Sequence, residues 1–221
     1  MFHVLFHDCN LTKSKGICYS MEVIKHLEIM RRGRFILTAL FMYPLTIFSK
    51  IINTVMTRTN KGFKVNSGDS RNNEHYKMKG VTLNVLDLKI SSKDTDGEIA
   101  VFEQIGFTPM GGPPLHIHPY QDEFFYIIEG DYLFQVGDEK YQMKSGDTIF
   151  LPRNIQHAFI QLTEKGKVIV SYVPAGKMED FFKKTDSWTA PPSNEEIAKT
   201  FADHDMKVVG PPLKVDSTII N

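Results

Sequence analysis

The feature that most constrains the fold is a series of short β-type runs at regular spacing between residues 80 and 173. Turn-forming residues such as Glu129-Gly130-Asp131 and Ser145-Gly146-Asp147 separate these runs. Eight or nine strands without an intervening helix predict an all-β protein, an antiparallel sandwich or barrel. The expected strands are 98–107, 115–118, 123–128, 132–136, 140–143, 148–151, 157–162 and 168–173, preceded by an alternating segment at 81–90 whose change of phase after Val85 predicts a β-bulge there.

The segments after and before these strands have other patterns. Residues 53–79 are a predicted linker, because 61–79 is polar and contains many Asn, Ser and Gly residues. After Pro174 the apolar spacing becomes helical, and Ser193 with Glu196 has the spacing of a capping box. We therefore expect 174–221 to form short helices and a tail that pack on the outside of the barrel.

The N-terminal segment resembles an export signal. Arg31, Arg32 and Arg34 precede an apolar, helical run at 35–48, which is too short to span a bilayer comfortably. We interpret 30–52 as a signal-peptide-like segment that starts at Met30, with 1–29 as an over-extended start or a disordered stretch. This predicts a periplasmic or secreted protein, or a membrane-anchored one if the segment is not cleaved. The alternatives are a membrane-surface or packing helix at 20–50 and a cytoplasmic location.

Composition restricts the chemistry available to the barrel. The chain has 26 Lys+Arg and 26 Asp+Glu, so its formal net charge is 0, which argues against a general nucleic-acid binder. The two cysteines, Cys9 and Cys18, both precede the expected domain. A metal site in the barrel must therefore use histidines and carboxylates.

Four potential metal ligands, His116, His118, Glu123 and His157, lie inside the strand-rich region. His116 and His118 are two residues apart in a strand, so their side chains point to the same side. The chain can reverse before Glu123, and His157 opens a later strand. We expect three nitrogens and one oxygen around one divalent ion, which leaves two positions of a six-coordinate metal open. Histidines that are merely satisfied in the core are the alternative.

The spacing of these residues resembles the two motifs of the cupin superfamily. Residues 116–130 read H-x-H-x4-E-x6-G, and residues 146–157 read G-x5-P-x4-H. The resemblance implies a single double-stranded β-helix, or jelly-roll, barrel at 80–173 with those four side chains as metal ligands. Three positions depart from the family pattern: Gly111 lies one residue nearer His116 than the family glycine, Asn154 replaces a glycine, and Gln161 replaces an asparagine.

Within this superfamily the sequence is most similar to small single-domain cupins described as quercetin 2,3-dioxygenase-like. The likeness rests on 112–118, on 152–154 and on short matches at 178–182, 192–193 and 210–212, and it covers about 80–213. It implies a homodimer and a metal-dependent dioxygenase. The ion could be Fe, Mn, Ni, Co, Cu or Zn.

The predicted pocket is apolar with the metal at one end. If Glu123 faces inward, Phe125 and Ile127 follow it by alternation, and Phe159 and Gln161 share the face of His157. Such a pocket suits a small aromatic or enolisable substrate, which would react with dioxygen while Glu123 acts as ligand and general base. The alternatives are a plain core, a non-redox enzyme such as a sugar isomerase or epimerase, and a non-catalytic binding protein. Trp188, His75 and His204 are expected to be structural.

Overall fold

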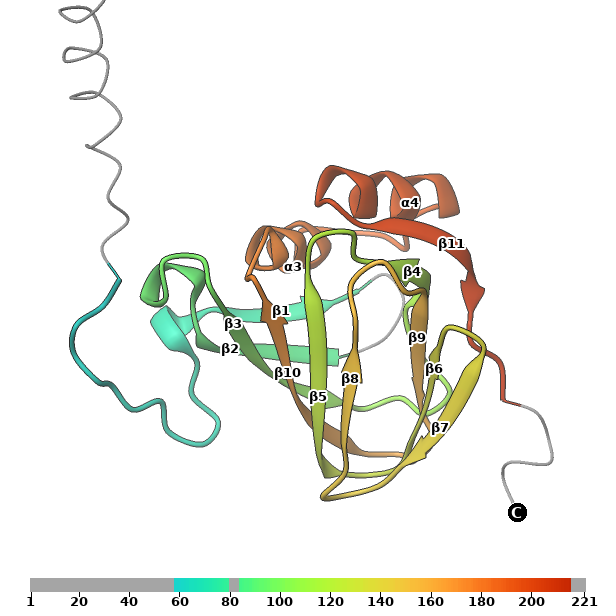
Figure 1. Ribbon diagram of the computed structural model, residues 1–221, viewed down its shortest axis with the longest axis horizontal. Coiled ribbons are helices and arrows are strands. Elements are labelled where there is room, and N and C mark those ends of the chain that lie inside the picture. Colours follow the sequence, from blue (N-terminus) through green and yellow to red (C-terminus); the bar gives the residue numbers. More distant parts are fainter. Residues whose placement is uncertain (1–57, 80–83, 216–221) are drawn as a thin grey trace, which may run out of the picture. The chain divides into compact units, whose positions relative to one another are not determined.

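A computed structural model describes residues 58–79 and 84–215, which contain two antiparallel β-sheets (Figure 1). The sheets exchange strands along the chain, since consecutive strands often lie in different sheets, as in a jelly roll. The prediction of an all-β jelly-roll barrel is confirmed. In spatial order the first sheet consists of β1 (His75–Met78), β2 (Asn84–Ile90), β3 (Ala100–Gly106), β10 (Gly166–Val173), β5 (Asp122–Glu129) and β8 (Thr148–Leu151), and the second of β11 (Lys207–Pro212), β4 (Pro114–Ile117), β9 (His157–Gln161), β6 (Tyr132–Val136) and β7 (Glu139–Met143).

Alternation of side chains along the strands builds the core between the two sheets. In β3 every second residue is buried, so Phe102 and Gln104 point into the barrel. Aromatic rings join the sheets, because Phe125 of β5 meets Phe134 of β6 with the ring centroids 5.0 Å apart. The barrel interior is therefore filled largely by aromatic and aliphatic side chains.

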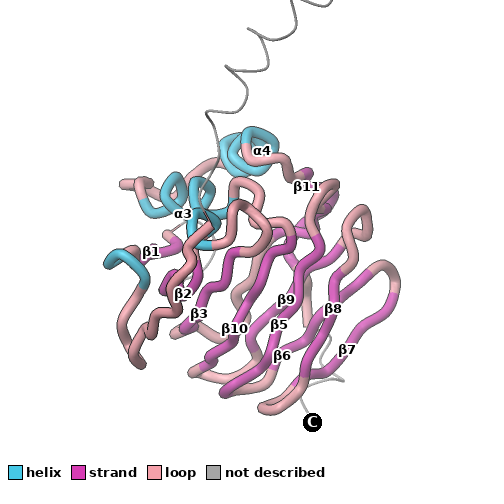
Figure 2. The backbone as a smooth tube through the Cα atoms, turned by 60° about the vertical axis from the view of Figure 1, so that its left-hand side comes forward, coloured by secondary structure: helices cyan, strands magenta, loops and turns pink. Residues whose placement is uncertain are grey.

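Two helices, α3 (Met178–Asp186) and α4 (Asn194–Asp203), lie at one end of the barrel (Figures 1 and 2). Buried residues in α3 recur at a spacing of three to four, which presents one apolar face to the barrel. Ser193 caps α4 by accepting a hydrogen bond from the backbone N–H of Glu196 at 3.1 Å. The helices were expected on the outside of the barrel, but some of their side chains line a cavity inside it.

The predicted linker at 53–79 ends too late. It contains the 3₁₀ turn η1 (Arg71–Asn73) and strand β1, and Tyr76 of β1 is a core residue with 3% exposure. Its ring lies 6.3 Å from those of Phe102 and Phe182. The strand was missed because a four-residue segment with one buried aromatic residue, between the exposed His75 and Lys77, gives no alternating pattern.

Two further details of the strand prediction were wrong. Pairing of β2 with β3 is regular at Val85 and Leu86, and the irregularity lies between Leu88 and Ile90, after which comes the 3₁₀ turn η2 (Ser92–Asp94). The sequence phase was misleading because Asp87 is buried as well, at 2.7 Å from His75. Strand β11 was not predicted, since its Gly-Pro-Pro ending indicates a turn; prolines are tolerated there because the strand is at a sheet edge.

The signal-like segment 30–52, residues 1–29 and both cysteines lie outside the described residues. Within 58–79 and 84–215, no helix is both long and apolar enough to cross a membrane. Export and the homodimer stay predictions.

Candidate metal centre

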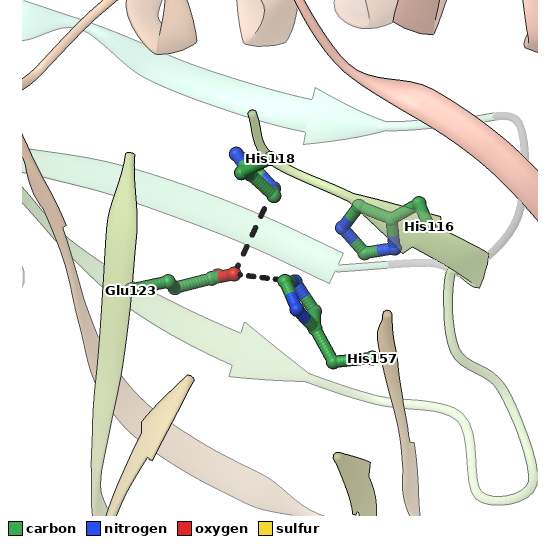
Figure 3. A group of neighbouring side chains, drawn as sticks. All are labelled: His116, His118, Glu123 and His157. Carbon is green, nitrogen blue, oxygen red and sulfur yellow. Dashed lines mark ion pairs between the residues drawn. The ribbon is translucent and has the colours of Figure 1, made fainter. Parts of the chain in front are cut away.

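Three histidines and one glutamate from both sheets meet inside the barrel (Figure 3). His116 belongs to β4 and pairs with His157, the first residue of β9, while His118 directly follows β4. Glu123 comes from β5 in the other sheet. One nitrogen or oxygen atom of each side chain lies within 4.8 Å of the others, and none of the four residues is more than 6% exposed. The structure thus brings together the four residues singled out in the sequence.

Backbone carbonyl groups bind the Nδ1 atoms of two of the histidines. His116 Nδ1 lies 2.8 Å from the carbonyl oxygen of Pro114, and His157 Nδ1 lies 3.0 Å from that of Ile155. A carbonyl oxygen can only accept, so each Nδ1 carries the proton and donates. Each Nε2 therefore keeps a lone pair, the form in which imidazole binds a metal ion.

The third histidine is held by a side chain that the sequence analysis did not select. Gln121 Oε1 lies 3.3 Å from His118 Nδ1. The amide nitrogen of Gln121 donates to the carbonyls of Pro174 and Ala175 at 3.1 and 2.8 Å, which fixes Oε1 toward the histidine. The only sequence signal was the position of Gln121 in the short turn between two candidate ligands.

Protonation states at the centre suit a divalent cation. Burial, together with the neighbouring His157 and His118, holds the pKa of His116 well below its usual value, and burial lowers the pKa of His118. Burial alone would raise the pKa of Glu123, but the nearby His157 and His118 outweigh it, so the pKa of Glu123 is lowered. These directions favour neutral imidazoles at His116 and His118 and an ionised carboxylate at Glu123, the forms that bind a divalent cation.

The environment of one atom of the cluster fits a bound cation. His157 Nε2 is buried and lies 3.1 Å from Glu123 Oε2, yet it has no hydrogen-bond partner among the described residues. Buried nitrogen atoms rarely stay unpaired in native proteins. The donor set and this unpaired nitrogen both fit one divalent metal ion, and the cluster could hold one.

Tyr172 supports the carboxylate from the neighbouring strand. It pairs with Glu123 between β10 and β5, and its ring lies 5.8 Å from that of His118. Burial and the nearby Glu123 raise the pKa of Tyr172 well above its usual value, so it is a neutral phenol beside the carboxylate. Alternation along β10 could have placed Tyr172 inside the barrel, but its pairing with Glu123 was not visible in the sequence.

A cavity of about 60 Å³ adjoins the cluster. Phe125 and Phe159 line it as predicted from alternation, whereas Ile127 and Gln161 do not. Ile127 lies in the core, and Gln161 donates a hydrogen bond to the carbonyl of Thr163 at 2.8 Å. Two of the four expected pocket residues thus belong to the packing around the cavity.

The helical end of the barrel closes this cavity. Phe181 of α3 and Phe201 of α4 line it, and the Phe201 ring lies 5.2 Å from the ring of His116. Trp188, which was expected to be structural, also lines the cavity, whereas His75 and His204 do not. His75 contacts Asp87 and His204 contacts the carbonyl of Thr200, each at 2.7 Å.

The departures from the family motif have local structural consequences. Met110, at the position of the family glycine, has φ 64°, and Asn154, which also replaces a glycine, has φ 66°. Glycine adopts positive φ without strain, and asparagine tolerates it better than other residues. The exposed Met110 is therefore a strained substitution, and Asn154 is a mild one.

Comparison with known proteins agrees with this geometry. A family model described as a cupin domain matches residues 105–173. The quercetin 2,3-dioxygenase of Bacillus subtilis is 31% identical over 94 residues, which are 42% of this chain and 27% of that protein. An uncharacterized protein of Methanocaldococcus jannaschii is 40% identical over 50 residues, 22% of this chain and 40% of that protein. The chain thus spans only about a quarter of the length of the first of these relatives and two fifths of the length of the second.

Solved structures with a similar chain course include an RmlC-like cupin from Shewanella frigidimarina, at 18% identity, a TM-score of 0.43, and coverage of 54% of this chain and 96% of that one. Another is the polyketide cyclase RemF from Streptomyces resistomycificus, at 19% identity, a TM-score of 0.43, and coverage of 52% and 80%. The family model identifies residues 105–173 as a cupin domain, and the jelly-roll sheets with the motif residues gathered inside them agree with this match.

Proposed function

We propose that this chain is a metal-dependent dioxygenase that acts on a small aromatic or enolisable substrate. The observation that carries the proposal is a buried cluster of three imidazoles and one ionised carboxylate that lines an apolar cavity. The match to the Bacillus subtilis quercetin 2,3-dioxygenase supports the same chemistry. A divalent ion in the cluster would supply Lewis acidity and a route for electrons from an enolate or phenolate to dioxygen.

Glu123 is the residue suited to take up the proton of the substrate. Its carboxylate is 4% exposed, lies 3.1 Å from His157 Nε2 and is ionised because the neighbouring histidines outweigh the effect of burial. A base in such a water-poor site can accept the proton of an enol or phenol that binds at the cluster. Tyr172, on the neighbouring strand, keeps this carboxylate in place.

The size of the cavity favours a small substrate over a flavonol. A cavity of 150 Å³ is known to hold benzene, whereas this one measures about 60 Å³. A single aromatic ring therefore enters only if side chains at the helical end, such as Phe181 and Phe201, move aside. The apolar walls also disfavour polyhydroxylated sugars, so no observation favours an isomerase or epimerase.

Oxygen uptake tests the proposal. Protein loaded separately with Fe²⁺, Mn²⁺, Ni²⁺, Co²⁺, Cu²⁺ or Zn²⁺ is offered a panel of flavonols, single-ring phenols and small enols in an oxygen electrode. We expect uptake that depends on the metal and matches substrate loss, with small substrates preferred. In Glu123→Gln, uptake should fall more than metal content, because the amide keeps an oxygen ligand but loses basicity. No uptake with any metal and substrate, in protein that contains the metal, would contradict the proposal.

A further inference from the structure

The cavity is also lined by two polar side chains that do not belong to the four-residue cluster. Gln104 of β3 and Trp188, which follows α3, both line the cavity, and each is 6% exposed. Within the described part of the chain, neither Gln104 Nε2 nor Trp188 Nε1 has a hydrogen-bond partner. The indole N–H can only donate, so at least one of these groups needs an acceptor whichever way the glutamine amide is turned.

These two side chains come from other elements than the four cluster residues. Gln104 points inward between Leu86 of β2 and Val168 of β10, its paired neighbours on either side. Trp188 comes from the helical end, where Thr185 Oγ1 of α3 lies 3.2 Å from Met78 Sδ of β1. The four cluster residues come from β4, its end, β5 and β9. One cavity therefore meets a cluster that could hold a cation and, separately, two N–H donors.

The unpaired amide and the unpaired indole N–H in one cavity call for an occupant. A buried N–H without an acceptor is destabilising, and native proteins keep few of them. The charge around the cavity narrows the choice, because its described lining contains no Lys or Arg, and Glu123 is its sole carboxylate. An anionic group bound to Gln104 and Trp188 would have no positively charged residue beside it, so an uncharged oxygen is favoured as their partner.

We propose that Gln104 and Trp188 form a donor subsite that selects the substrate. Their N–H groups bind an uncharged carbonyl or hydroxyl oxygen of a small planar molecule whose second oxygen faces the cluster. The rings of Phe125 and Phe159 line the same cavity and suit the apolar body of such a molecule. The orientation of the ligand rests on the proposed function, but binding at the subsite requires no turnover. The competing occupant is an ordered water molecule.

Two phenols that differ in one group provide the probes. 4-Hydroxybenzyl alcohol carries a hydroxyl opposite its phenol, and 4-ethylphenol has a methyl group in that place, with similar size and acidity. Calorimetric titration of the full-length, metal-loaded protein gives the affinity for each. The variants are Gln104→Met, which keeps length and volume, and Trp188→Phe, which keeps an aromatic ring. Gln135→Met is the matched control, because Gln135 of β6 is half-buried but does not line the cavity.

We expect both subsite variants to weaken binding of the alcohol by about fivefold to tenfold and that of 4-ethylphenol by less than twofold, as for the loss of a neutral hydrogen bond. The control should change neither affinity. Equal effects on the two phenols would overturn the proposal; the two residues would then bind an ordered water molecule or only pack. Failure of the wild type to bind either phenol would overturn the proposed class of ligand. If Gln104→Met does not fold, Gln104→Asn, which withdraws the amide by one methylene, must show the same selective loss. Selective loss without oxygen uptake would support the subsite and refute the dioxygenase.

Discussion

Replacement of Gln121 tests whether the cluster depends on the residues that orient its histidines. Gln121→Leu removes the acceptor 3.3 Å from His118 Nδ1 and both donors to the carbonyls of Pro174 and Ala175. Loss of an orienting partner of a metal-binding histidine typically lowers metal affinity by about 10- to 100-fold, or roughly 1.4–2.7 kcal/mol. The hydrogen bond to His118 is long, so we expect the lower end, about tenfold. Two unpaired carbonyls should also reduce the free energy of unfolding by roughly 1–3 kcal/mol each.

A second variant separates these two effects. Gln121→Glu keeps an oxygen acceptor for His118 but loses the two N–H donors. Stability should fall in both variants, whereas metal affinity should fall only in Gln121→Leu. Metal-free protein is titrated with Zn²⁺ in competition with a coloured chelator, and urea unfolding gives stability. Gln135→Leu is the control, since Gln135 makes a hydrogen bond to the carbonyl of Gly137 away from the cluster. A Zn²⁺ affinity of Gln121→Leu within twofold of this control would refute the orienting role.

Three further predictions concern ligands, pH and backbone strain. His116→Ala and His157→Ala should each lose most of the metal found in the wild type while keeping a cooperative thermal transition; equal metal contents would identify core histidines instead. Burial lowers the pKa of His116 and His118 in the folded protein. As pH falls, these two histidines are therefore protonated in the unfolded chain before they are protonated in the folded one. The metal-free protein should therefore lose stability as pH falls below about 6.5, by at most about 1.4 kcal/mol per pH unit and proton; equal urea midpoints at pH 7.5 and 5.5 would contradict this. Met110→Gly should raise the free energy of unfolding by about 1 kcal/mol, because it relieves a positive φ at an exposed site. Urea unfolding measures this change, and a lower free energy of unfolding in the variant would contradict the prediction.

The strands and the four cluster residues could be predicted because their signals are local. Side chains alternate along a strand, so His116 and His118 had to share a face whatever the rest of the chain did. Likewise, the apolar spacing and the Ser193 cap of the C-terminal helices depend on a few neighbouring residues. Sequence alone therefore determined the fold class and the candidate ligands.

Other features depend on which distant segments meet. Tyr172 supports Glu123 because β10 pairs with β5, and Trp188 lines the cavity because the helices pack across one end of the barrel. Neither pairing leaves a pattern within a short stretch of sequence, and the same holds for β1, whose burial rests on Tyr76 alone. Gln104 lies on the buried face of β3, and that its amide nitrogen has no partner among the described residues becomes visible only once the surrounding side chains are in place. Tertiary structure decides these features because burial and hydrogen bonding are properties of the assembled barrel, to which residues far apart in the chain contribute.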